Sequence, residues 1–425
     1  MSLDKLHQIF LNSTGVSTDT RNITKGNLFF ALSGGNFNGN KFAKEAIEKG
    51  ASMAIIDDKD FAINEKYILV DNSLKTLQEL AKFHRNQLDI PIIAITGSNG
   101  KTTTKELITS VLQQKFNTQA TIGNLNNHIG VPLTLLSMTT ETEIGVVEMG
   151  ANHQKEIEFL CTIAQPNYGY ITNFGKAHLE GFGGFEGVIK GKSELYDYLI
   201  KNNLAIFINL DDKIQVEQSK NGKVISFSET ALKSNYQIKL HEVNPFVSIN
   251  TNNLRIQSRL IGLYNAKNIA AAISIGLHFK VPLKDIKTAI ENYTPTNNRS
   301  QIINKNGNYI ILDAYNANPT SMEAALKNLN AISKNNKTVI LGDMFEVGNT
   351  SELEHQKIID LLEEYNFSEM LVCGTHFYQA KSTKVKKFKN YEALADYLTQ
   401  HRYQENTILI KGSRGMQLER ALDLL

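Results

Sequence analysis

The sequence predicts an α/β protein of three domains, and three observations support this prediction. First, 425 residues are too many for a single hydrophobic core. Second, short apolar strands alternate with helices along most of the chain, which is typical of mainly parallel sheets. Third, residues 293–300 (Tyr-Thr-Pro-Thr-Asn-Asn-Arg-Ser) have the composition of a linker. We therefore expect domains at residues 1–88, 89–296 and 297–425.

The composition is that of an ordinary globular protein. Hydrophobic residues make up 41% and charged residues 21%, which argues against disorder, and the net charge of +2 excludes nucleic-acid or membrane binding by bulk charge. The two cysteines, Cys161 and Cys373, lie in apolar stretches and are expected to be buried thiols in a reducing compartment. Residues 1–10 lack the apolar run of a signal peptide, and no stretch reaches the roughly 20 apolar residues of a membrane span. We expect a cytoplasmic protein.

The first domain is expected to be a small α/β unit. Its predicted elements are strands at 27–32, 53–56 and 67–70 and helices at 41–49 and 74–87. Apolar residues recur at helical spacing in the second of these helices, so one of its faces should be buried.

The central domain opens with a buried type of strand at 92–96, a Gly-rich turn and a helix that is apolar on one face. Further strands are predicted at 144–149, 168–172 and 204–209, with helices between them, so we expect a doubly wound, mainly parallel sheet. Residues 223–260 alternate in short strands and are expected to form an antiparallel annex. An Ala-rich helix follows at residues 265–277.

The last domain repeats the alternation after the linker, which predicts a Rossmann-like α/β unit. The predicted strands are 309–313, 338–342, 370–373 and 407–410, and the predicted helices are 319–332, 351–365, 391–401 and 415–424.

The Gly-rich turn has the features of a phosphate-binding loop. Its sequence is Gly97-Ser98-Asn99-Gly100-Lys101-Thr102, between an apolar strand and a helix. Glycines let backbone N–H groups approach phosphates, and the helix N-terminus adds partial positive charge. Lys101 would neutralise the terminal phosphates and the Thr102 hydroxyl would bind Mg²⁺. The commonest form of this loop has a glycine where this chain has Ile95, and an ordinary strand-to-helix turn is the alternative interpretation.

Candidate metal ligands follow two later strands. Glu148 ends the strand at 144–149, and His178 follows the strand at 168–172, at the edge where open α/β sheets bind ligands. A lone glutamate or histidine is usually structural, and Mg²⁺ prefers oxygen ligands, so His178 would need a supporting partner. Lys190 and Lys192 lie two residues apart on the next helix and therefore on different faces. The residue pattern leaves open which of them points into the site.

Several segments together resemble the ATP-dependent ligases that build the peptide stem of peptidoglycan, the Mur ligase family. The resemblance covers essentially the whole chain. The segments are residues 17–21 (Ser-Thr-Asp-Thr-Arg), 28–34 (Leu-Phe-Phe-Ala-Leu-Ser-Gly), 96–104 (Thr-Gly-Ser-Asn-Gly-Lys-Thr-Thr-Thr), 126–132 (Asn-Asn-His-Ile-Gly-Val-Pro), 148–153 (Glu-Met-Gly-Ala-Asn-His), 178–183 (His-Leu-Glu-Gly-Phe-Gly), 313–319 (Asp-Ala-Tyr-Asn-Ala-Asn-Pro), 341–348 (Leu-Gly-Asp-Met-Phe-Glu-Val-Gly) and 411–414 (Lys-Gly-Ser-Arg).

The resemblance implies a reaction. We expect ATP to phosphorylate the carboxylate of UDP-N-acetylmuramoyl-tripeptide to an acyl phosphate, which the amine of D-alanyl-D-alanine then attacks to give an amide, ADP and phosphate. Mg²⁺ and Lys101 would stabilise the charge that develops. Relatives of this kind are typically monomers.

The resemblance also implies residue roles. Thr102 and Glu148 match ligands of one Mg²⁺, and His178 matches a ligand of a second. Lys192 matches a carbamylated lysine that bridges to this second metal, with Lys190 as the alternative. The residues expected to act in the chemistry itself are Lys101, His178, Lys192 and Arg299.

Nucleotide and substrate sites are implied in the same way. The nucleotide is expected to contact Gly97, Ser98, Asn99, Gly100, Lys101, Thr102, Thr103, Asn265, Asn268, Arg299, Asp313, Tyr315, Asn318 and Pro319. The UDP-sugar and peptide substrates are expected to contact Asp19, Thr20, Arg21, Leu32, Gly34, Phe37, Gly39, Asn127, His128, Asp343 and Lys411. Helix caps or surface charges remain the alternative interpretation for Asp343 and Lys411.

Other functions remain as alternatives. A sibling ligase that adds the third stem residue carries an Asp-Asn-Pro-Arg motif, where this chain has Gly-Asp-Met-Phe at residues 342–345. A folylpolyglutamate synthetase lacks a comparable first domain. A P-loop GTPase would carry a guanine-reading Asn-Lys-x-Asp motif, which is absent, and a motor or transport ATPase would need a coupling surface. An inactive UDP-sugar-binding module would not need Lys101, Glu148, His178 and Lys192 together. The identity of the third stem residue, meso-diaminopimelate or L-lysine, stays open.

Overall fold

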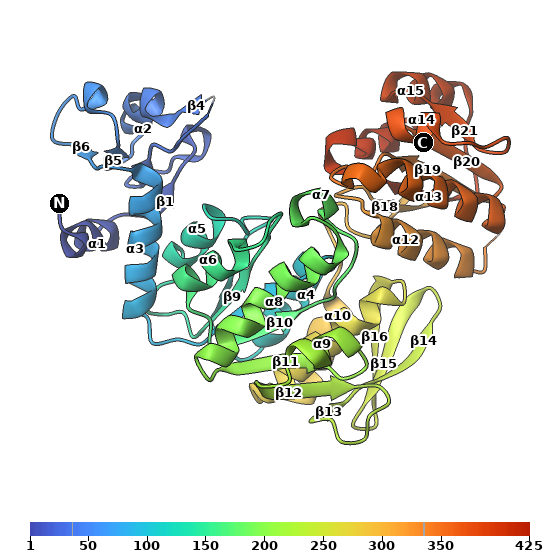
Figure 1. The fold of residues 1–425 in the computed structure, drawn as a ribbon, viewed down its shortest axis with the longest axis horizontal. Helices are drawn as coiled ribbons and strands as arrows, with labels where there is room; N and C mark the ends of the chain where they lie inside the picture. The colour runs from blue at the N-terminus through green and yellow to red at the C-terminus, as the bar shows by residue number, and fades with distance from the viewer. Residues whose placement is uncertain (36, 335) are drawn as a thin grey trace.

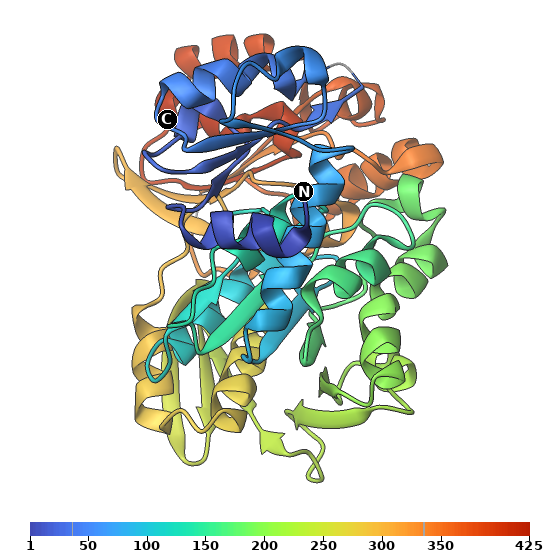
Figure 2. The same cartoon turned by 90° about the vertical axis from the view of Figure 1, so that its left-hand side faces the viewer.

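The computed structural model describes residues 1–35, 37–334 and 336–425 and has three α/β regions. Figure 1 shows the N-terminal region at one side, the C-terminal region at the other, and the central region between and below them. The view turned by 90° shows the long helix α3 (Ser73–Gln87) running from the N-terminal sheet down along the central region (Figure 2). Among the described residues, no helix has both the length and the apolar character needed to cross a membrane.

The N-terminal region contains a parallel sheet in the order β1-β2-β5-β6. Its strands are β1 (Val16–Ser17), β2 (Leu28–Phe30), β5 (Met53–Ile56) and β6 (Tyr67–Leu69), and a hairpin of β3 (Ser33–Gly34) and β4 (Phe37–Asn38) lies beside it. The helices are α1 (Leu3–Leu11), α2 (Ala43–Glu48) and α3, with 3₁₀ turns η1 (Thr20–Asn22), η2 (Gly39–Phe42) and η3 (Lys59–Phe61). Sequence periodicity did not reveal α1, which is only nine residues long.

Helix α3 joins the N-terminal sheet to the central region. The Asn72 side chain caps its N-terminus by accepting a hydrogen bond from the backbone N–H of Lys75. Leu77, Leu80 and Ala81 are fully buried in a core that also contains residues of the central sheet such as Ile92. The apolar face predicted from the sequence is therefore buried against the central region as well as its own sheet.

The central region is built on a seven-stranded parallel sheet in the order β13-β12-β11-β10-β7-β9-β8. Its strands are β7 (Ile92–Thr96), β8 (Thr118–Ala120), β9 (Ile144–Glu148), β10 (Tyr168–Ile171), β11 (Ala205–Asn209), β12 (Lys223–Ser228) and β13 (Tyr236–Gln237). Its helices are α4 (Lys101–Leu112), α5 (Gly130–Leu136), α6 (Glu156–Ala164), α7 (Leu179–Phe182), α8 (Phe185–Lys201), α9 (Lys213–Gln218), α10 (Tyr264–His278) and α11 (Leu283–Asn292). The order places β7, which precedes the Gly-rich loop, between β9 and β10, so the loop lies among the ends of three strands.

The antiparallel annex is smaller than predicted. Only β14 (Lys239–Val243), β15 (Phe246–Thr251) and β16 (Leu254–Ile261) form the antiparallel sheet. Strands β12 and β13, which were expected to belong to it, instead extend the main sheet, where β12 pairs in parallel with β11 and β13 pairs in parallel with β12. Alternation of polar and apolar residues does not distinguish these cases, because the last strands of a parallel sheet can also be half exposed.

The C-terminal region contains a six-stranded sheet in the order β17-β18-β22-β19-β20-β21, in which only β17 and β18 pair antiparallel. The strands are β17 (Gln301–Lys305), β18 (Asn308–Asp313), β19 (Lys337–Gly342), β20 (Glu369–Cys373), β21 (Lys386–Phe388) and β22 (Thr407–Lys411). The helices are α12 (Pro319–Ala331), α13 (Ser351–Tyr365), α14 (Thr375–Gln379) and α15 (Tyr391–Gln400), with the 3₁₀ turn η4 (Gly348–Thr350). The helix predicted at 415–424 is instead two 3₁₀ segments, η5 (Arg414–Met416) and η6 (Leu418–Leu424).

Candidate functional site

The loop between β7 and α4 has a backbone that requires glycine at two positions. Gly97 has φ +138°, and a Cβ atom there would lie 2.1 Å from Thr172 Oγ1. Gly100 has φ +79° and a Cβ atom there would lie 2.9 Å from Asn268 Oδ1. Left-handed φ values and close neighbours both exclude a side chain. The glycines of the predicted phosphate loop therefore allow it to pack against β10 and α10.

Lys101 lies at the first residue of α4, over this loop. Its ammonium donates to the carbonyl oxygens of Gly97 at 2.8 Å and Ser98 at 3.4 Å. Burial lowers its pKa, Glu148 acts in the opposite direction, and Arg299 lowers the pKa further. Cations gathered at a helix N-terminus favour a bound anion.

A cavity of about 930 Å³ surrounds Lys101 and is lined by both the central and the C-terminal regions. Of the residues predicted from the sequence, those lining it are Ser98, Asn99, Gly100, Lys101, Thr102, Thr103, Asn127, His128, Glu148, His178, Asn265, Asn268, Arg299, Asp313, Tyr315, Asn318 and Lys411. The structure thus brings together residues that are more than 300 positions apart in the chain.

Glu148 presents a buried carboxylate to this cavity. One of its oxygens accepts a hydrogen bond from Asn126 Nδ2 at 2.7 Å, and the other has no hydrogen-bond partner among the described residues. A buried carboxylate oxygen without a partner is costly unless a cation or donor joins it. Thr102, also buried at the cavity, is a second oxygen donor. These residues fit a hard cation such as Mg²⁺, which prefers oxygen ligands.

His178 lines the same cavity and contacts the C-terminal region. Its Nδ1 lies 2.5 Å from Glu346 Oε2, and a hydrogen bond from His178 lowers the pKa of Glu346 although burial acts in the opposite direction. Its backbone is left-handed, with φ +52°, at the residue before α7. Within the part of the chain that the structure describes, no group of three His, Cys, Asp or Glu side chains is arranged to hold a metal.

The two candidate lysines of α8 differ sharply in environment. Lys192 is completely buried, donates to the carbonyl oxygen of Ala151 at 3.0 Å and lies 4.9 Å from the centre of the Phe182 ring. Burial lowers its pKa well below the ordinary value, and Lys101 adds to this effect. Lys190 is exposed. Lys192 does not line the cavity itself, but Ala151 does.

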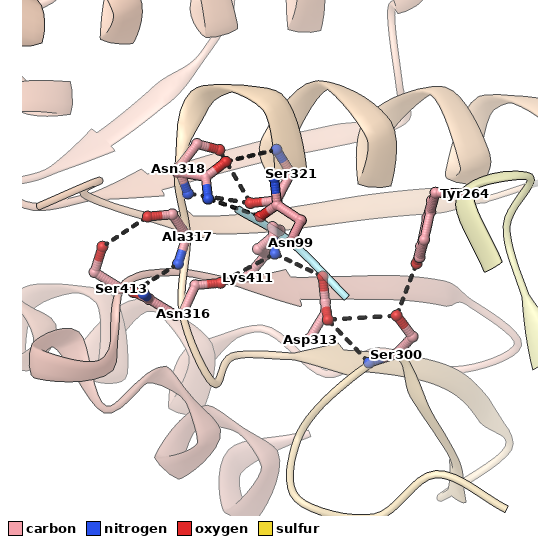
Figure 3. A network of polar contacts seen from close by, with 10 residues as sticks. All are labelled: Asn99, Tyr264, Ser300, Asp313, Asn316, Ala317, Asn318, Ser321, Lys411 and Ser413. Carbon is pink, nitrogen blue, oxygen red and sulfur yellow. Dashed lines mark hydrogen bonds and ion pairs between the residues drawn. The ribbon is translucent and has the colours of Figure 1, made fainter. Parts of the chain in front are cut away.

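The C-terminal side of the cavity is a hydrogen-bonded network (Figure 3). Lys411 Nζ donates to Asp313 Oδ2 at 2.6 Å, and the other Asp313 oxygen accepts from the backbone N–H of Ser300 at 2.9 Å. Asn318 caps α12 and also donates to Asn99 Oδ1 of the Gly-rich loop at 2.7 Å. The network therefore connects the C-terminal region directly to the loop around Lys101.

Arg299 approaches the cavity from the linker. Its guanidinium carbon lies 3.6 Å from the centre of the Tyr315 ring, a cation–π arrangement. Its buried Nε has no hydrogen-bond partner within residues 1–35, 37–334 and 336–425. Burial lowers the pKa values of Lys101 and Lys105, and Arg299 lowers both further, while Glu148 acts in the opposite direction.

Some predicted residues lie outside the cavity. Asp343 is buried and accepts hydrogen bonds from the backbone N–H groups of His376 and Phe377 at 2.9 Å each, so it caps α14. Pro319 is the first residue of α12, and Gly97, the first residue of the Gly-rich loop, packs against Thr172. The helix-cap alternative therefore describes the contacts of Asp343.

The predicted residues of the N-terminal region lie at a separate surface. Gly34 and Phe37 line a shallow hollow there, next to Asn40 and Asp57. Asp19 and Arg21 form an exposed pair 2.6 Å apart, and the hydrogen bonds from Arg21 lower the pKa of Asp19 to about 2. The residues placed in this region are Asp19, Thr20, Arg21, Leu32, Gly34, Phe37 and Gly39. A Cβ atom at Gly39 would lie 2.2 Å from the Leu32 carbonyl oxygen, so glycine is required for packing there.

Sequence reasoning did not assign several residues of the cavity. Asn126 donates a hydrogen bond to Glu148 and so orients it. Within the segment 126–132, however, only Asn127 and His128 were predicted to have a role. Tyr264 shares a hydrogen bond with Ser300 Oγ at 2.7 Å, and nothing in its sequence neighbourhood signals this contact. Asn316 accepts from Lys411 Nζ through its carbonyl oxygen at 3.2 Å. Such contacts depend on the approach of two regions and leave no local pattern.

Comparison with known proteins identifies the family. Models of the Mur ligase family match residues 12–85 (Mur ligase family, catalytic domain), 95–276 (Mur ligase middle domain) and 298–414 (Mur ligase, glutamate ligase domain). The chain belongs to the Mur ligase family. This Mur ligase is 36% identical to the UDP-N-acetylmuramoyl-tripeptide–D-alanyl-D-alanine ligase of Buchnera aphidicola subsp. Baizongia pistaciae, over 97% of this chain and 92% of the relative. It is 33% identical to the enzyme of the same name from Bacillus subtilis, over 95% and 91% of the two chains.

Solved structures agree with this assignment. The crystal structure of MurF from Acinetobacter baumannii superposes with a TM-score of 0.86 at 30% identity and covers 100% of this Mur ligase and 98% of that chain. The structure of MurF ligase from Thermotoga maritima in complex with ADP superposes with a TM-score of 0.84 at 26% identity, over 98% and 97% of the two chains. The three-domain α/β fold predicted from the sequence is confirmed.

Proposed function

We propose that this Mur ligase joins D-alanyl-D-alanine to UDP-N-acetylmuramoyl-tripeptide, with conversion of ATP to ADP and phosphate, in the cytoplasmic synthesis of peptidoglycan. The relatives that carry this name cover nearly the whole chain. The observation that carries the proposal is the shared cavity. It joins the phosphate loop, the Glu148 carboxylate and the C-terminal pair Asp313 and Lys411, as a reaction between a nucleotide and a second substrate requires.

The first chemical step fits the cations at the cavity. The terminal carboxylate oxygen of the tripeptide attacks the γ-phosphorus of ATP, the bond to the β,γ-bridging oxygen breaks, and ADP leaves. Lys101, with the N-terminus of α4, holds the phosphates and neutralises the charge that moves to the bridging oxygen. Arg299 adds a second cation that brings the two anionic substrates together.

The second step forms the amide. The amine of D-alanyl-D-alanine attacks the acyl carbon, the C–O bond to phosphate breaks after a tetrahedral intermediate, and the amine loses a proton. The cations stabilise the departing phosphate, and enclosure between two regions limits hydrolysis of the acyl phosphate.

Thr102 and Glu148 are the residues that would hold Mg²⁺, since both offer buried oxygens and one Glu148 oxygen has no partner among those described. When bound, the ion supplies positive charge between phosphate and carboxylate oxygens. We assign His178 to a second metal position, where it would exchange its contact with Glu346 for the ion.

Lys192 is the proposed site of carbamylation. Its buried amine, with a lowered pKa, favours the neutral form that attacks carbon dioxide, with formation of an N–C bond and loss of a proton. The product is a carboxylate-like oxygen ligand, and the adjacent Ala151 carbonyl lies at the cavity. The exposed position of Lys190 offers no such environment.

We assign the hollow beside Gly34 and Phe37, together with Asp19, Thr20 and Arg21, to the UDP-sugar, with a monomer as the functional unit. The stacked rings of Phe37 and Phe42, 5.3 Å apart, offer an apolar wall at this surface. Asn127 and His128, which line the cavity together with Lys101, are assigned to the peptide.

The ligation assay tests the proposed function. Phosphate release from ATP is expected to require both UDP-N-acetylmuramoyl-tripeptide and D-alanyl-D-alanine, with a ligated product of the summed mass less water. The tripeptides with meso-diaminopimelate and L-lysine are compared in parallel. Release of phosphate without either substrate would instead indicate a motor or transport ATPase, and ligation of an amino acid to the dipeptide precursor would indicate the sibling ligase.

If Lys192 is carbamylated, variants at Lys192 and Lys190 should differ in activity. Lys192→Ala is expected to lower kcat by about a hundredfold, because a ligand of the metal site is lost, and acetate or formate should restore part of the rate. Lys190→Ala, on the same helix but exposed, is the control and should retain activity. Full activity of Lys192→Ala, or loss of activity confined to Lys190→Ala, would contradict the assignment.

A further inference from the structure

The linker between α11 and β17 is anchored at its start to the helix that begins at Lys101. Tyr293 Oη donates to Glu106 Oε2 at 2.6 Å, and Asn297 Nδ2 donates to Glu106 Oε1 at 3.4 Å. Glu106 lies on α4, five residues after Lys101. One carboxylate of the phosphate-loop helix therefore holds two side chains of the segment that leads into the C-terminal region.

The end of the linker is anchored to a different partner. The backbone N–H of Ser300 donates to Asp313 Oδ1 at 2.9 Å, and the Ser300 hydroxyl contacts Tyr264 Oη at 2.7 Å. Between the two anchors, Asn297 and Asn298 both have left-handed backbones, with φ +63° and +54°. Asparagine adopts this conformation more readily than other non-glycine residues, so the two residues form a turn between the anchors. The path of the linker is thus fixed by contacts at both ends.

Arg299 lies between these anchors. Its guanidinium stacks on Tyr315 and its Nε carries no partner within the described chain, so the position of the side chain in the cavity depends on the linker and on the Tyr315 ring. Glu106 does not line the cavity. Its carboxylate therefore affects the reacting groups only through the linker and α4.

The Glu106–Tyr293 contact has the properties of a strong hydrogen bond. The Glu106 side chain is 24% exposed, and the nearest described cation, Lys105 Nζ, is 3.9 Å from its other oxygen. Burial and then the Glu106 carboxylate raise the pKa of Tyr293 far above its ordinary value, so the hydroxyl remains a proton donor. Hydrogen bonds to an ionised acceptor are short and stronger than neutral ones.

We propose that Glu106 is a positioning residue: through Tyr293 and Asn297 it holds the linker against α4, so that Arg299 meets the phosphates bound at Lys101. This inference rests on the proposed ligase function, because it assigns Glu106 a part in the phosphoryl-transfer step. It also predicts that nucleotide binding at α4 and the placement of the C-terminal region depend on each other through one carboxylate.

The test is a double-mutant cycle between Glu106 and Arg299. Glu106→Gln and Tyr293→Phe are each expected to lower kcat about tenfold, with a small change in KM for the UDP-tripeptide, because misplacing a group by a fraction of an ångström has an effect of this order. In an Arg299→Ala background, Glu106→Gln should cause less than a twofold further loss. The matched control is Glu217→Gln, which removes an exposed carboxylate of helix α9 that is paired with Lys220.

The outcomes separate the inference from the proposed function. Equal fold-losses from Glu106→Gln in the wild-type and Arg299→Ala backgrounds, or an unchanged kcat in both single variants, would overturn the positioning role. The melting temperature shows whether Glu106→Gln folds normally. If it does not, Tyr293→Phe still tests the positioning role, because it removes the same hydrogen bond and keeps the Glu106 carboxylate. If the wild-type protein does not ligate, the proposed function fails. The Glu106–Arg299 coupling is then measured from ATP affinity by calorimetry, with additivity again as the contradicting result.

Discussion

Gly97 is one of the two glycines on which the conformation of the loop at residues 97–102 depends. Gly97 packs so closely on β10 that an added methyl group would overlap Thr172 Oγ1, and its φ of +138° disfavours any L side chain. Strain and overlap of this kind typically cost about 1–3 kcal/mol each. The loop would have to shift away from Thr172, and the backbone N–H groups proposed to bind the phosphates would shift with it.

Gly97→Ala is therefore expected to weaken ATP binding more than tenfold and to lower stability by about 2 kcal/mol or more. Isothermal titration with an ATP analogue and chemical denaturation measure the two effects. Gly35→Ala is the control, because a Cβ atom there meets no atom within 4 Å and the backbone is not left-handed. Tight binding by Gly97→Ala would show that the phosphates lie elsewhere.

Individual site residues were predictable where a local pattern carries them. The loop at 97–102 could be found because strand, glycines, lysine and helix follow one another in the chain, and the structure has the strand and the helix on either side of it. The choice between Lys190 and Lys192 could not be made from helical spacing, since spacing separates faces but does not say which one is buried. Burial of Lys192 against Phe182 depends on α7, which folds back onto α8.

Among the helices, α1 is attached through a pair of buried histidines. His7 Nε2 lies 3.0 Å from His84 Nδ1, and His84 Nε2 lies 2.8 Å from the carbonyl oxygen of Met138 in the central region. Burial lowers the pKa of both imidazoles. His84 lowers that of His7 further, while Asp4 acts in the opposite direction. The contact between α1 and α3 therefore requires neutral rings.

This pair predicts a pH dependence of stability. The unfolded chain binds protons near the ordinary imidazole pKa of 6.5, whereas the folded chain excludes them, so the free energy of unfolding falls as the pH drops below about 6.5. Urea denaturation between pH 7.5 and 5.5 should show this loss, and in His7→Phe the dependence of the unfolding free energy on pH should become weaker. His241→Gln, at an exposed histidine, is the control. If the free energy of unfolding depends on pH in His7→Phe as it does in the wild type, the prediction is wrong, and His7 accepts a proton in the folded protein without leaving its site.

Among the secondary-structure elements, long segments with apolar residues at helical spacing were predicted well. Short elements, and segments whose geometry depends on distant contacts, were not. Helices α12 and α13 follow the predicted ranges closely, because apolar residues recur at helical spacing and Asn318 caps the first of them. The C-terminal segment after Arg414 has an apolar pattern but adopts 3₁₀ turns. Its geometry is set by packing of Leu418 against Gly342 and Gly412, which no local pattern reveals.

In the whole molecule, the central and C-terminal regions meet through polar contacts beside the cavity and through apolar residues of the central region, such as Ile261, that pack in the C-terminal core. Lys176, after β10, donates to Glu354 Oε1 of α13 at 2.8 Å, and its backbone N–H donates to Thr320 Oγ1 at 3.0 Å. The resemblance to a known family implied nucleotide contacts from residues of the last domain, but it gave no indication of these partners. Contacts between regions join residues far apart in the chain, and their register depends on how whole sheets are oriented.

One of these contacts, between Lys176 and Glu354, joins two oppositely charged side chains. Burial acts to raise the pKa of Glu354, but hydrogen bonds from Lys176 and Lys357 outweigh burial and lower it. Only Lys176 comes from the other region, since Lys357 lies on the same helix three residues away. Because Lys176 is 39% exposed, the pair across the interface contributes only about 1 kcal/mol, or about a fivefold shift in the ratio of closed to open molecules.

Lys176→Ala and Glu354→Gln are accordingly expected to open the molecule by similar amounts, measured as the distance between fluorescent labels in the central and C-terminal regions. Lys357→Ala is the matched control, because it removes a lysine from the same carboxylate without crossing the interface. The double variant Lys176→Ala/Glu354→Gln should open no further than either single variant, since both remove one interaction. If Lys357→Ala opens the molecule as far as Lys176→Ala, the carboxylate acts by stabilising α13 rather than by joining the two regions. The position of the C-terminal region would then depend on the Asn99–Asn318 contact and on the linker instead.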